Sequence, residues 1–267
     1  FVDEARLSAR LLHANIIHTL DVIELPDEVA LVMEYVHGES LWSLLRLARA
    51  QGKVIPLRVA CSLVSSVLHG LHAAHETRGD AGEPLELVHR DVSPQNVLVG
   101  SDGIPRLLDF GIAKALGRLR STPHGEIKGK LGYIACEQLH GKKVDRRTDV
   151  YGASAVLWET LAGAPLFDGA SEPEIVHRVL YEPVAPPSSQ RSEVPVGLDA
   201  IVLRGLHRDP TRRFPTALET ALAIEREMGL ATQSEVAAWL TGLAGDRLAA
   251  RAQAITDMLE RGVGGSR

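Results

Sequence analysis

The stretch His89-Arg90-Asp91-Val92-Ser93-Pro94-Gln95-Asn96, followed by Leu108-Asp109-Phe110-Gly111, carries most of the information about fold and chemistry. Its first run places Asp91 and Asn96 five positions apart, directly before an apolar pair. Its second run places Asp109 at a glycine turn, 13 residues after Asn96. A phosphoryl-transfer site needs a carboxylate that orients the attacking hydroxyl, and a second carboxylate with an amide that hold Mg²⁺ on the phosphates. The residue types, their order and their spacing therefore predict such a site.

At these residues the chain resembles a protein kinase catalytic domain of the bacterial eukaryotic-like (Hanks-type) Ser/Thr branch. The resemblance implies that Asp91 is the catalytic base with Arg90 beside it, and that Asn96 and Asp109 bind Mg²⁺. An ordinary turn aspartate is the alternative for both carboxylates. The presence of His89, Arg90 and Asn96 at motif positions favours the catalytic interpretation.

The resemblance also implies where ATP binds. Met33-Glu34-Tyr35-Val36 resembles the hinge between the two kinase lobes, which binds adenine through backbone groups. Met33, the carbonyl of Glu34, the amide of Val36 and the side chain of Leu98 are therefore the expected adenine site. A plain buried strand is the alternative on local sequence alone.

The first residues, Phe1-Val2-Asp3-Glu4-Ala5, resemble the start of the helix whose glutamate pairs with a strand lysine in kinases. Glu4 is then the catalytic partner of that lysine; a solvated helix charge is the alternative. The lysine and the Gly-rich loop that usually precede this helix are not within the 267 residues. Because preorganised charges carry much of the catalysis, we expect these residues alone to be inactive or nearly so.

Three further positions depart from the family pattern. Ser93 stands where Ser/Thr kinases usually carry a lysine, and Lys130 stands where a threonine often links this segment to the catalytic aspartate. Cys136 replaces a proline in Gly132-Tyr133-Ile134-Ala135-Cys136-Glu137. Pro94 and Gln138 resemble the bacterial Ser/Thr pattern, so the sequence favours Ser/Thr over Tyr as the phosphorylated residue.

Two structural roles follow from the same resemblance. Glu137 is expected to form an ion pair with Arg213, and Asp149 is expected to hold the backbone of the catalytic loop. Ser121 and Thr122 are candidates for phosphorylation, with Arg90 as the partner of the phosphate. A redox role for Cys136 is the weaker alternative to a small residue that fills the proline position.

Hydrophobic periodicity and capping residues predict the elements. Strands are expected over 16–24, 29–36, 97–99 and 106–108, with a turn at Pro26-Asp27 and a mobile loop from Asp109 to Glu137. Helices are expected over 2–12, over 41–50 with Ser40 as N-cap, from Pro56 to about His75, from a Thr148 cap to about Leu161, near 196–206 and 215–228, and as two helices within 233–262.

Strands followed by a helical body predict an α+β, two-lobed protein-kinase-like fold with a truncated N-lobe and a mostly helical C-lobe. The resemblance runs from Glu4 to about Arg213. We expect a partial N-lobe over 1–36 (a helix, two strands and the hinge), a C-lobe over 37–228, and a C-terminal helical extension over 229–267.

Composition narrows the class of protein. The chain is 45% hydrophobic and 24% charged, which is ordinary for a globular domain, and its net charge of -5 argues against nucleic-acid binding. Two cysteines fit a reducing compartment, so the expected location is cytoplasmic. No membrane-spanning segment is expected. ATP and a protein substrate are the expected partners.

Two other functions are compatible with parts of the sequence. A truncated kinase remnant could act as a non-enzymatic interaction module, although it would not need Asp91, Asn96 and Asp109 together. A small-molecule phosphotransferase of the aminoglycoside kinase type shares an aspartate–asparagine loop, but Arg90 and Asp149 fit protein kinases better. A metal site at His69, His72 and His75 is disfavoured because this spacing spreads the side chains around a helix.

Overall fold

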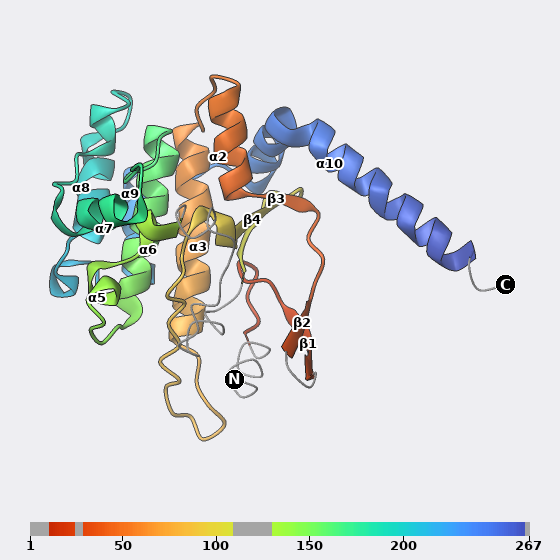
Figure 1. Cartoon of the computed structure of the whole chain (residues 1–267), viewed down its shortest axis with the longest axis horizontal. Helices are drawn as coiled ribbons and strands as arrows, with labels where there is room; N and C mark the ends of the chain where they lie inside the picture. Colours follow the sequence, from red (N-terminus) through yellow and green to blue (C-terminus); the bar gives the residue numbers. More distant parts are fainter. Residues whose placement is uncertain (1–10, 25–28, 109–129, 265–267) are drawn as a thin grey trace.

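The computed structural model describes residues 11–24, 29–108 and 130–264. Several sequence predictions fall outside these ranges: Glu4 and the body of the helix over 2–12, the turn at Pro26-Asp27, and Asp109, Ser121 and Thr122 with most of the predicted loop. The described part is a mostly helical body with small antiparallel sheets on one side, as Figure 1 shows. This arrangement agrees with the predicted α+β fold of few strands and a helical C-lobe.

The strands form two separate small sheets. β1 (Thr19–Glu24) pairs with β2 (Val29–Met33), and β3 (Gly38–Ser40), β4 (Val97–Gly100) and β5 (Pro105–Leu107) form the second sheet in that order. β1 is shorter than predicted because the chain before it pairs instead with β5, and β2 ends at Met33, before the predicted end at residue 36. The amide of Ile17 donates to the carbonyl of Leu107 at 2.9 Å. β3 was missed, since three residues beginning with a glycine give no periodic signal.

The helical body surrounds one central helix. α3 (Leu57–His75) packs against α6 (Arg146–Ala162) and α9 (Ala217–Glu227), and α6 also packs against α8 (Val196–Gly205). α6 is buried on all sides over most of its length, as its uniformly apolar sequence predicts. α2 (Leu41–Ala50) has the predicted limits, and its N-cap is Ser40, whose hydroxyl accepts from the amide of Ser43 at 3.2 Å. The remaining elements are α5 (Cys136–Leu139), α7 (Glu172–Tyr181) and short 3-10 turns at Pro94–Asn96, Leu131–Tyr133, Pro187–Ser189 and Pro210–Arg212.

The predicted N-cap of α6 was wrong. The helix begins one turn earlier, at Arg146, and its cap is Asp145, whose carboxylate accepts from the amide of Arg147 at 2.9 Å. Aspartate caps a helix at least as well as threonine, so Asp145 can start the helix before Thr148 is reached. Thr148 lies inside the first turn, and its hydroxyl donates to Glu137 at 2.8 Å.

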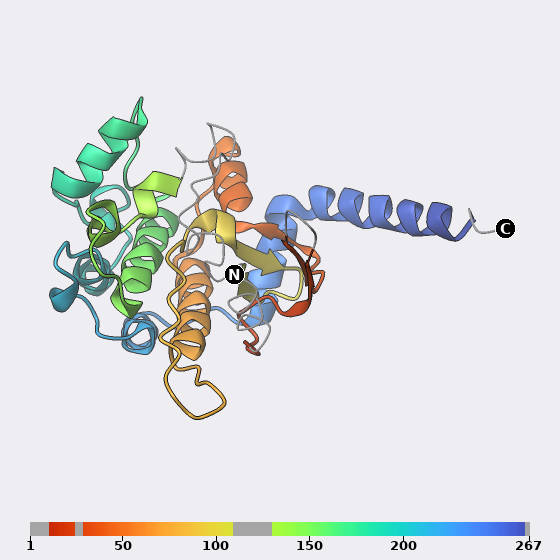
Figure 2. The ribbon, with the colours of Figure 1, turned by 60° about the horizontal axis from the view of Figure 1, so that its bottom comes forward.

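The C-terminal segment is one helix, α10 (Gln233–Gly264), where two were predicted. Gly242 and Gly245 weaken a helix but do not end it, and the segment holds no proline. The first part of α10 buries Val236, Leu240, Leu243, Ala244 and Leu248 in the main core. Arg251 pairs with Glu39 at 3.1 Å. The C-terminal part of α10 extends away from the body (Figures 1 and 2).

One described helix, α3, is long and apolar enough to cross a membrane by length and composition. Most of that helix is buried against other helices of the fold, and this packing accounts for its apolar character.

A buried ion pair joins two distant segments, as the sequence predicted. The guanidinium of Arg213 contacts the carboxylate of Glu137 at 2.6 Å (Nη1–Oε1) and 2.8 Å (Nη2–Oε2). Its other protons go to the carbonyls of His207, Arg147 and Arg208, so all five donors of the guanidinium are used. Burial opposes ionisation of Glu137, but the hydrogen bonds and charge of Arg213 outweigh it and hold the pKa of this carboxyl below its ordinary value.

We therefore expect Glu137→Gln to lower the free energy of unfolding by about 3–5 kcal/mol at pH 7, because it leaves the buried guanidinium without its counter-charge. Urea titration measures this loss. Glu76→Gln is the matched control: it removes an exposed partner of Arg146 and should cost no more than about 1 kcal/mol. Equal losses in the two variants would contradict the buried role of Glu137.

The same pair predicts a pH dependence. A carboxyl whose pKa is lowered on folding stabilises the folded state above the unfolded pKa of about 4.5, and that contribution disappears as the pH falls through the lowered value. The stability difference between wild type and Glu137→Gln should therefore be constant from about pH 5 to 8 and shrink below about pH 4.5. Urea titrations repeated across this range test it; a gap that widens in acid would contradict the sign.

Candidate active site

The loop that carries His89, Arg90 and Asp91, the catalytic loop, is held by hydrogen bonds to Asp149, a buried residue of the first turn of α6. One carboxylate oxygen accepts from the amide of Arg90 at 2.8 Å, and the other accepts from the amide of His89 at 2.8 Å and from Nε2 of His75 at 2.7 Å. Arg90 has a φ of 64°, a left-handed conformation that a non-glycine residue rarely adopts. The two amide contacts fix this strained backbone, as the sequence predicted for Asp149.

His89 connects this loop to the strand that precedes Asp109. The ring is fully buried; its Nδ1 lies 3.2 Å from the amide of Asp91, and its Nε2 lies 2.9 Å from the carbonyl of Leu108. An amide can only donate, so Nδ1 is the acceptor and Nε2 carries the proton that the carbonyl of Leu108 accepts. The imidazole is therefore neutral in this arrangement and acts as a spacer between the two motifs.

A glycine allows the loop to lie directly on α6. A Cβ at Gly152 would lie 2.9 Å from the Cβ of Val92 and 3.0 Å from its carbonyl oxygen, closer than side chains tolerate. Val92 follows Asp91, so contact with the backbone of α6 sets the depth of the candidate base.

Asp91 and Asn96 converge at the other side of this loop. The amide nitrogen of Asn96 donates to the backbone carbonyl of Asp91 at 2.7 Å and to its carboxylate at 3.0 Å. Both nitrogen-bound protons of Asn96 are thereby directed at Asp91, so its side-chain oxygen is turned away from that residue. An oriented carboxylate beside an oriented amide oxygen is the arrangement that hydroxyl activation and Mg²⁺ binding require.

A third side chain, Lys130, completes the cluster. Its ammonium nitrogen lies 3.1 Å from the carboxylate of Asp91 and 3.4 Å from the side-chain oxygen of Asn96. Sequence reasoning noted Lys130 only as a departure from a family position and did not include it among the site residues. Its place beside the Gly132–Glu137 motif was the available signal, since that motif fixes the end of the segment against the C-lobe.

The other predicted catalytic and metal-binding residues are placed as follows. The side chain of Arg90 is exposed. Asp109 and Glu4 lie outside the described residues. The preceding residue, Leu108, donates its amide to the carbonyl of Asn96 at 2.9 Å, so the chain enters the second motif directly beside the first.

The predicted adenine site is only partly assembled by the described contacts. β2 ends at Met33, and the next residues lead to β3. Glu34 bonds back to His18: its amide donates to the carbonyl of His18 at 3.0 Å, and its carboxylate accepts from the amide of His18 at 2.9 Å. Val36 is half-buried, and Leu98 lies half-buried on β4. The structure thus shows a connection between the two sheets at this position.

The three histidines of α3 have separate environments. His75 binds Asp149, whereas His69 lies 2.8 Å from Glu225 on α9. His72 is surrounded by charged neighbours, but burial is the largest effect on it and lowers the pKa of its ring. Among the described residues, no group of three or more potential ligands is placed to hold a metal ion.

Both cysteines are free and buried. Burial raises the pKa of the Cys61 thiol to about 12 and also raises that of Cys136. A thiol needs thiolate character and access to be redox-active, so the environment of Cys136 favours a packing role.

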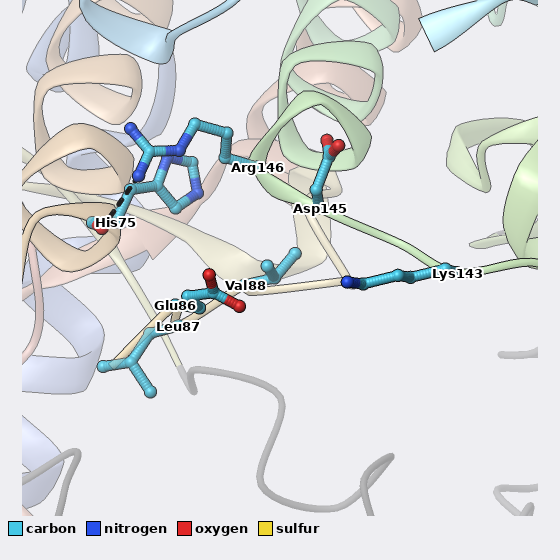
Figure 3. Close-up of a pocket in the computed structure, with 7 residues that line it drawn as sticks. All are labelled: His75, Glu86, Leu87, Val88, Lys143, Asp145 and Arg146. Atoms are coloured by element: carbon cyan, nitrogen blue, oxygen red, sulfur yellow. Dashed lines mark hydrogen bonds between the residues drawn. The ribbon is translucent and has the colours of Figure 1, made fainter. Parts of the chain in front are cut away.

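A pocket of about 360 Å³ lies on the α3 side of the catalytic loop, lined by His75, Glu86, Leu87, Val88, Lys143, Asp145 and Arg146. Figure 3 shows these side chains around the opening, with Arg146 bonded to the backbone of His75. Its lining mixes acidic and basic groups and includes none of the residues that converge at Asp91. Through His75 it borders the Asp149 contact that holds the loop.

The contacts of Asp149 predict the effect of removing its charge. Asp149→Asn should lower the free energy of unfolding by about 3 kcal/mol or more. The substitution turns one buried carboxylate oxygen into an NH₂ group, which cannot accept a hydrogen bond, and it removes the negative charge from the oxygen that remains. Amide hydrogen exchange should show reduced protection specifically at His89 and Arg90. Asp199→Asn is the control: Asp199 is buried and accepts from the amide of Ser188, far from this loop in the sequence. Unchanged protection at His89 and Arg90 in Asp149→Asn would contradict the tether.

Comparisons with known proteins agree with this geometry. A family model described as a protein kinase domain matches residues 1–223. The tyrosine-protein kinase MasK of Myxococcus xanthus is 39% identical over 225 residues, covering 84% of this chain and 35% of that protein. The serine/threonine-protein kinase PknA of Corynebacterium glutamicum is 32% identical over 233 residues (84% and 46%), and PknB of Mycobacterium leprae is 32% identical over 224 residues (82% and 34%). The chain thus spans less than half the length of these curated relatives. It belongs to the protein kinase family, in its bacterial Hanks-type branch.

Proposed function

We propose that this chain forms the catalytic part of a kinase that transfers the γ-phosphate of ATP to a serine or threonine hydroxyl of a protein. The observation that carries the proposal is the convergence of Asp91, Asn96 and Lys130 on a loop whose strained backbone is held by Asp149. A binding module has no need of a carboxylate, an amide oxygen and a cation at one point. Phosphoryl transfer needs all three kinds of group.

Asp91 is the proposed base. Its carboxylate accepts a hydrogen bond from the substrate hydroxyl and aligns that oxygen with the γ-phosphorus. The new bond forms between this oxygen and phosphorus while the bond from phosphorus to the leaving ADP oxygen breaks. The hydroxyl proton passes to Asp91, which releases it to product or solvent. Asn96 orients the carboxylate through its 3.0 Å hydrogen bond.

The residues present fit Mg²⁺. The side-chain oxygen of Asn96 is a hard, oriented ligand, because both protons of its amide nitrogen are engaged by Asp91. Asp109 is the proposed second ligand, and its neighbour Leu108 is bonded to the backbone of Asn96. When bound, the ion would neutralise charge on the phosphates.

The nucleotide site is proposed on the hinge-like segment. Met33, the carbonyl of Glu34 and the amide of Val36 would hold the adenine edge, with Leu98 beneath the ring. Glu4 is proposed to pair with a lysine supplied from outside the described residues. These assignments rest on the family resemblance and on the half-buried positions of Val36 and Leu98.

Serine or threonine is favoured as the acceptor by Pro94 and Gln138. Gln138 donates to the carbonyl of Arg90 at 2.9 Å and accepts from the amide of Ala135, so it joins the substrate side of the site to the catalytic loop. The relatives include proteins named for tyrosine and for serine/threonine activity. A pocket of about 260 Å³, lined among others by Trp42, Tyr133 and Phe167, offers space for a peptide side chain. We infer a cytoplasmic location from the free, buried cysteines.

The first test is Mg²⁺-dependent ATP binding by the chain, measured by calorimetry, with Asp109→Ala as the variant. Binding with a dissociation constant in the micromolar range, weakened at least tenfold by Asp109→Ala, is expected, because the metal holds the phosphates. Asp168→Ala, which removes an exposed carboxylate of a loop before α7, is the matched control. Absence of any ATP binding would favour the non-enzymatic interaction module instead.

Phosphotransfer itself is tested with Asp91→Asn, which keeps the shape of the side chain and removes its basicity. We expect turnover to fall by a factor of about 10² to 10⁴, with ATP affinity changed little. The 267 residues alone are expected to be weak catalysts compared with the protein in which any sequence preceding Phe1 is retained, since no Gly-rich loop lies within them. Strong Asp91-dependent turnover by the 267 residues alone would overturn that second expectation.

A further inference from the structure

We propose that Lys130 is a catalytic residue of this kinase: its ammonium group moves onto the transferred phosphoryl group and stabilises the charge that develops there. This role rests on the kinase activity proposed above, so it can be tested separately only in protein that has this activity. The observation behind it is the pair of contacts that Lys130 makes, 3.1 Å to Asp91 and 3.4 Å to Asn96.

The two contacts locate the ammonium group at the reaction centre. The substrate hydroxyl must lie on the carboxylate of Asp91, and the metal that carries the phosphates must lie on the oxygen of Asn96. A group that touches both oxygens occupies the space between nucleophile and metal, through which the phosphoryl group passes. An ammonium there has three protons, of which the described residues accept two.

Metal binding supplies the reason for a movement. Mg²⁺ held by Asn96 would compete with the ammonium group of Lys130 for the same side-chain oxygen, and its double charge would make it the stronger competitor. Lys130 is 30% exposed and has a flexible four-carbon stem, so its nitrogen can turn from Asn96 to a phosphate oxygen while it stays near Asp91.

The described residues of the loop around Asp91 do not place a positive charge at this point. Ser93, two residues after Asp91, is buried, and its hydroxyl has no hydrogen-bond partner among the residues that the structure describes. The side chain of Arg90 is exposed, and its backbone is committed to Asp149 and Gln138. A cation from the neighbouring segment therefore supplies what the loop lacks. Lys130 neither gains nor loses a proton in the reaction; its contribution is electrostatic.

The test uses the protein with any sequence preceding Phe1 retained, MgATP, and casein as the acceptor. Lys130→Met keeps the length of the side chain and removes the charge. We expect kcat to fall by about 10²- to 10³-fold, while the dissociation constant for MgATP changes less than about threefold, because the charge acts in the transition state. Lys142→Met, at an exposed lysine of the same lobe, is the matched control and should retain full activity.

A chemical rescue separates the charge from a structural role. Lys130→Cys should lose activity to the same extent, and alkylation of the new thiol with bromoethylamine, which restores an ammonium group at nearly the same distance, should return at least a tenth of wild-type kcat. Cys61 and Cys136 are buried with raised pKa values, so they react slowly, and treated wild type controls for other thiols.

The outcomes are distinguishable. An active wild type together with a kcat of Lys130→Met equal to or above the wild-type value would overturn this role. Lys130 would then be a side chain that blocks the metal site and must leave it when the metal binds. Loss of kcat without rescue by bromoethylamine would also overturn it, in favour of a purely structural contact. A wild type that transfers no phosphate to casein or to itself would overturn the proposed function, and the role of Lys130 with it.

Discussion

The candidate active site depends on the carboxylate of Asp149. It accepts three hydrogen bonds, from His75, His89 and Arg90, in a position closed to solvent. A buried charge without partners is costly, so the fold that buries Asp149 also requires the loop amides to point at it. That requirement holds Arg90 in its left-handed conformation and turns the next residue, Asp91, toward Asn96. The geometry of the base is therefore set by a helix of the core.

The same end of α6 holds the opposite side of the site. Thr148 donates to Glu137, and the carbonyl of Arg147 accepts from Arg213, which closes its ion pair with Glu137. Three successive residues of one helical turn thus bind the catalytic loop and the segment that begins at Lys130. Because α6 is packed on α3, α8 and α9, neither segment can shift without disturbing the helical core. The core residues do not touch substrate, yet they determine the distance between Lys130 and Asp91.

Much of this arrangement could be predicted from the sequence, and the failures have physical causes. The pairing of Glu137 with Arg213 and the tether of Asp149 were predicted because each belongs to a motif of fixed spacing. The limits of α2 were predicted because a serine cap and a glycine after its end bracket the helix. β3 was missed because three residues give no periodic signal and pairing with β4 holds the strand. The start of α6 was missed because Asp145 and Thr148, three residues apart, are both of types that cap helices. α10 was divided into two helices in the prediction, whereas core contacts on both sides of Gly242 keep it continuous.

Lys130 shows why the charge of a site cannot be read from one motif alone. In the sequence it lies 39 residues from Asp91, and its place beside the Gly132–Glu137 motif is the one local signal that it belongs to the site. Its position follows only from two anchors. Asp149 binds the backbone of the loop, and Glu137, seven residues after Lys130, is bound by Thr148 of the same helical turn. Both anchors are buried and hydrogen-bonded, whereas the Lys130 side chain between them is 30% exposed. A fixed frame that carries a partly exposed cation is suited to the role proposed for Lys130, in which a positive charge follows a phosphoryl group from donor to acceptor.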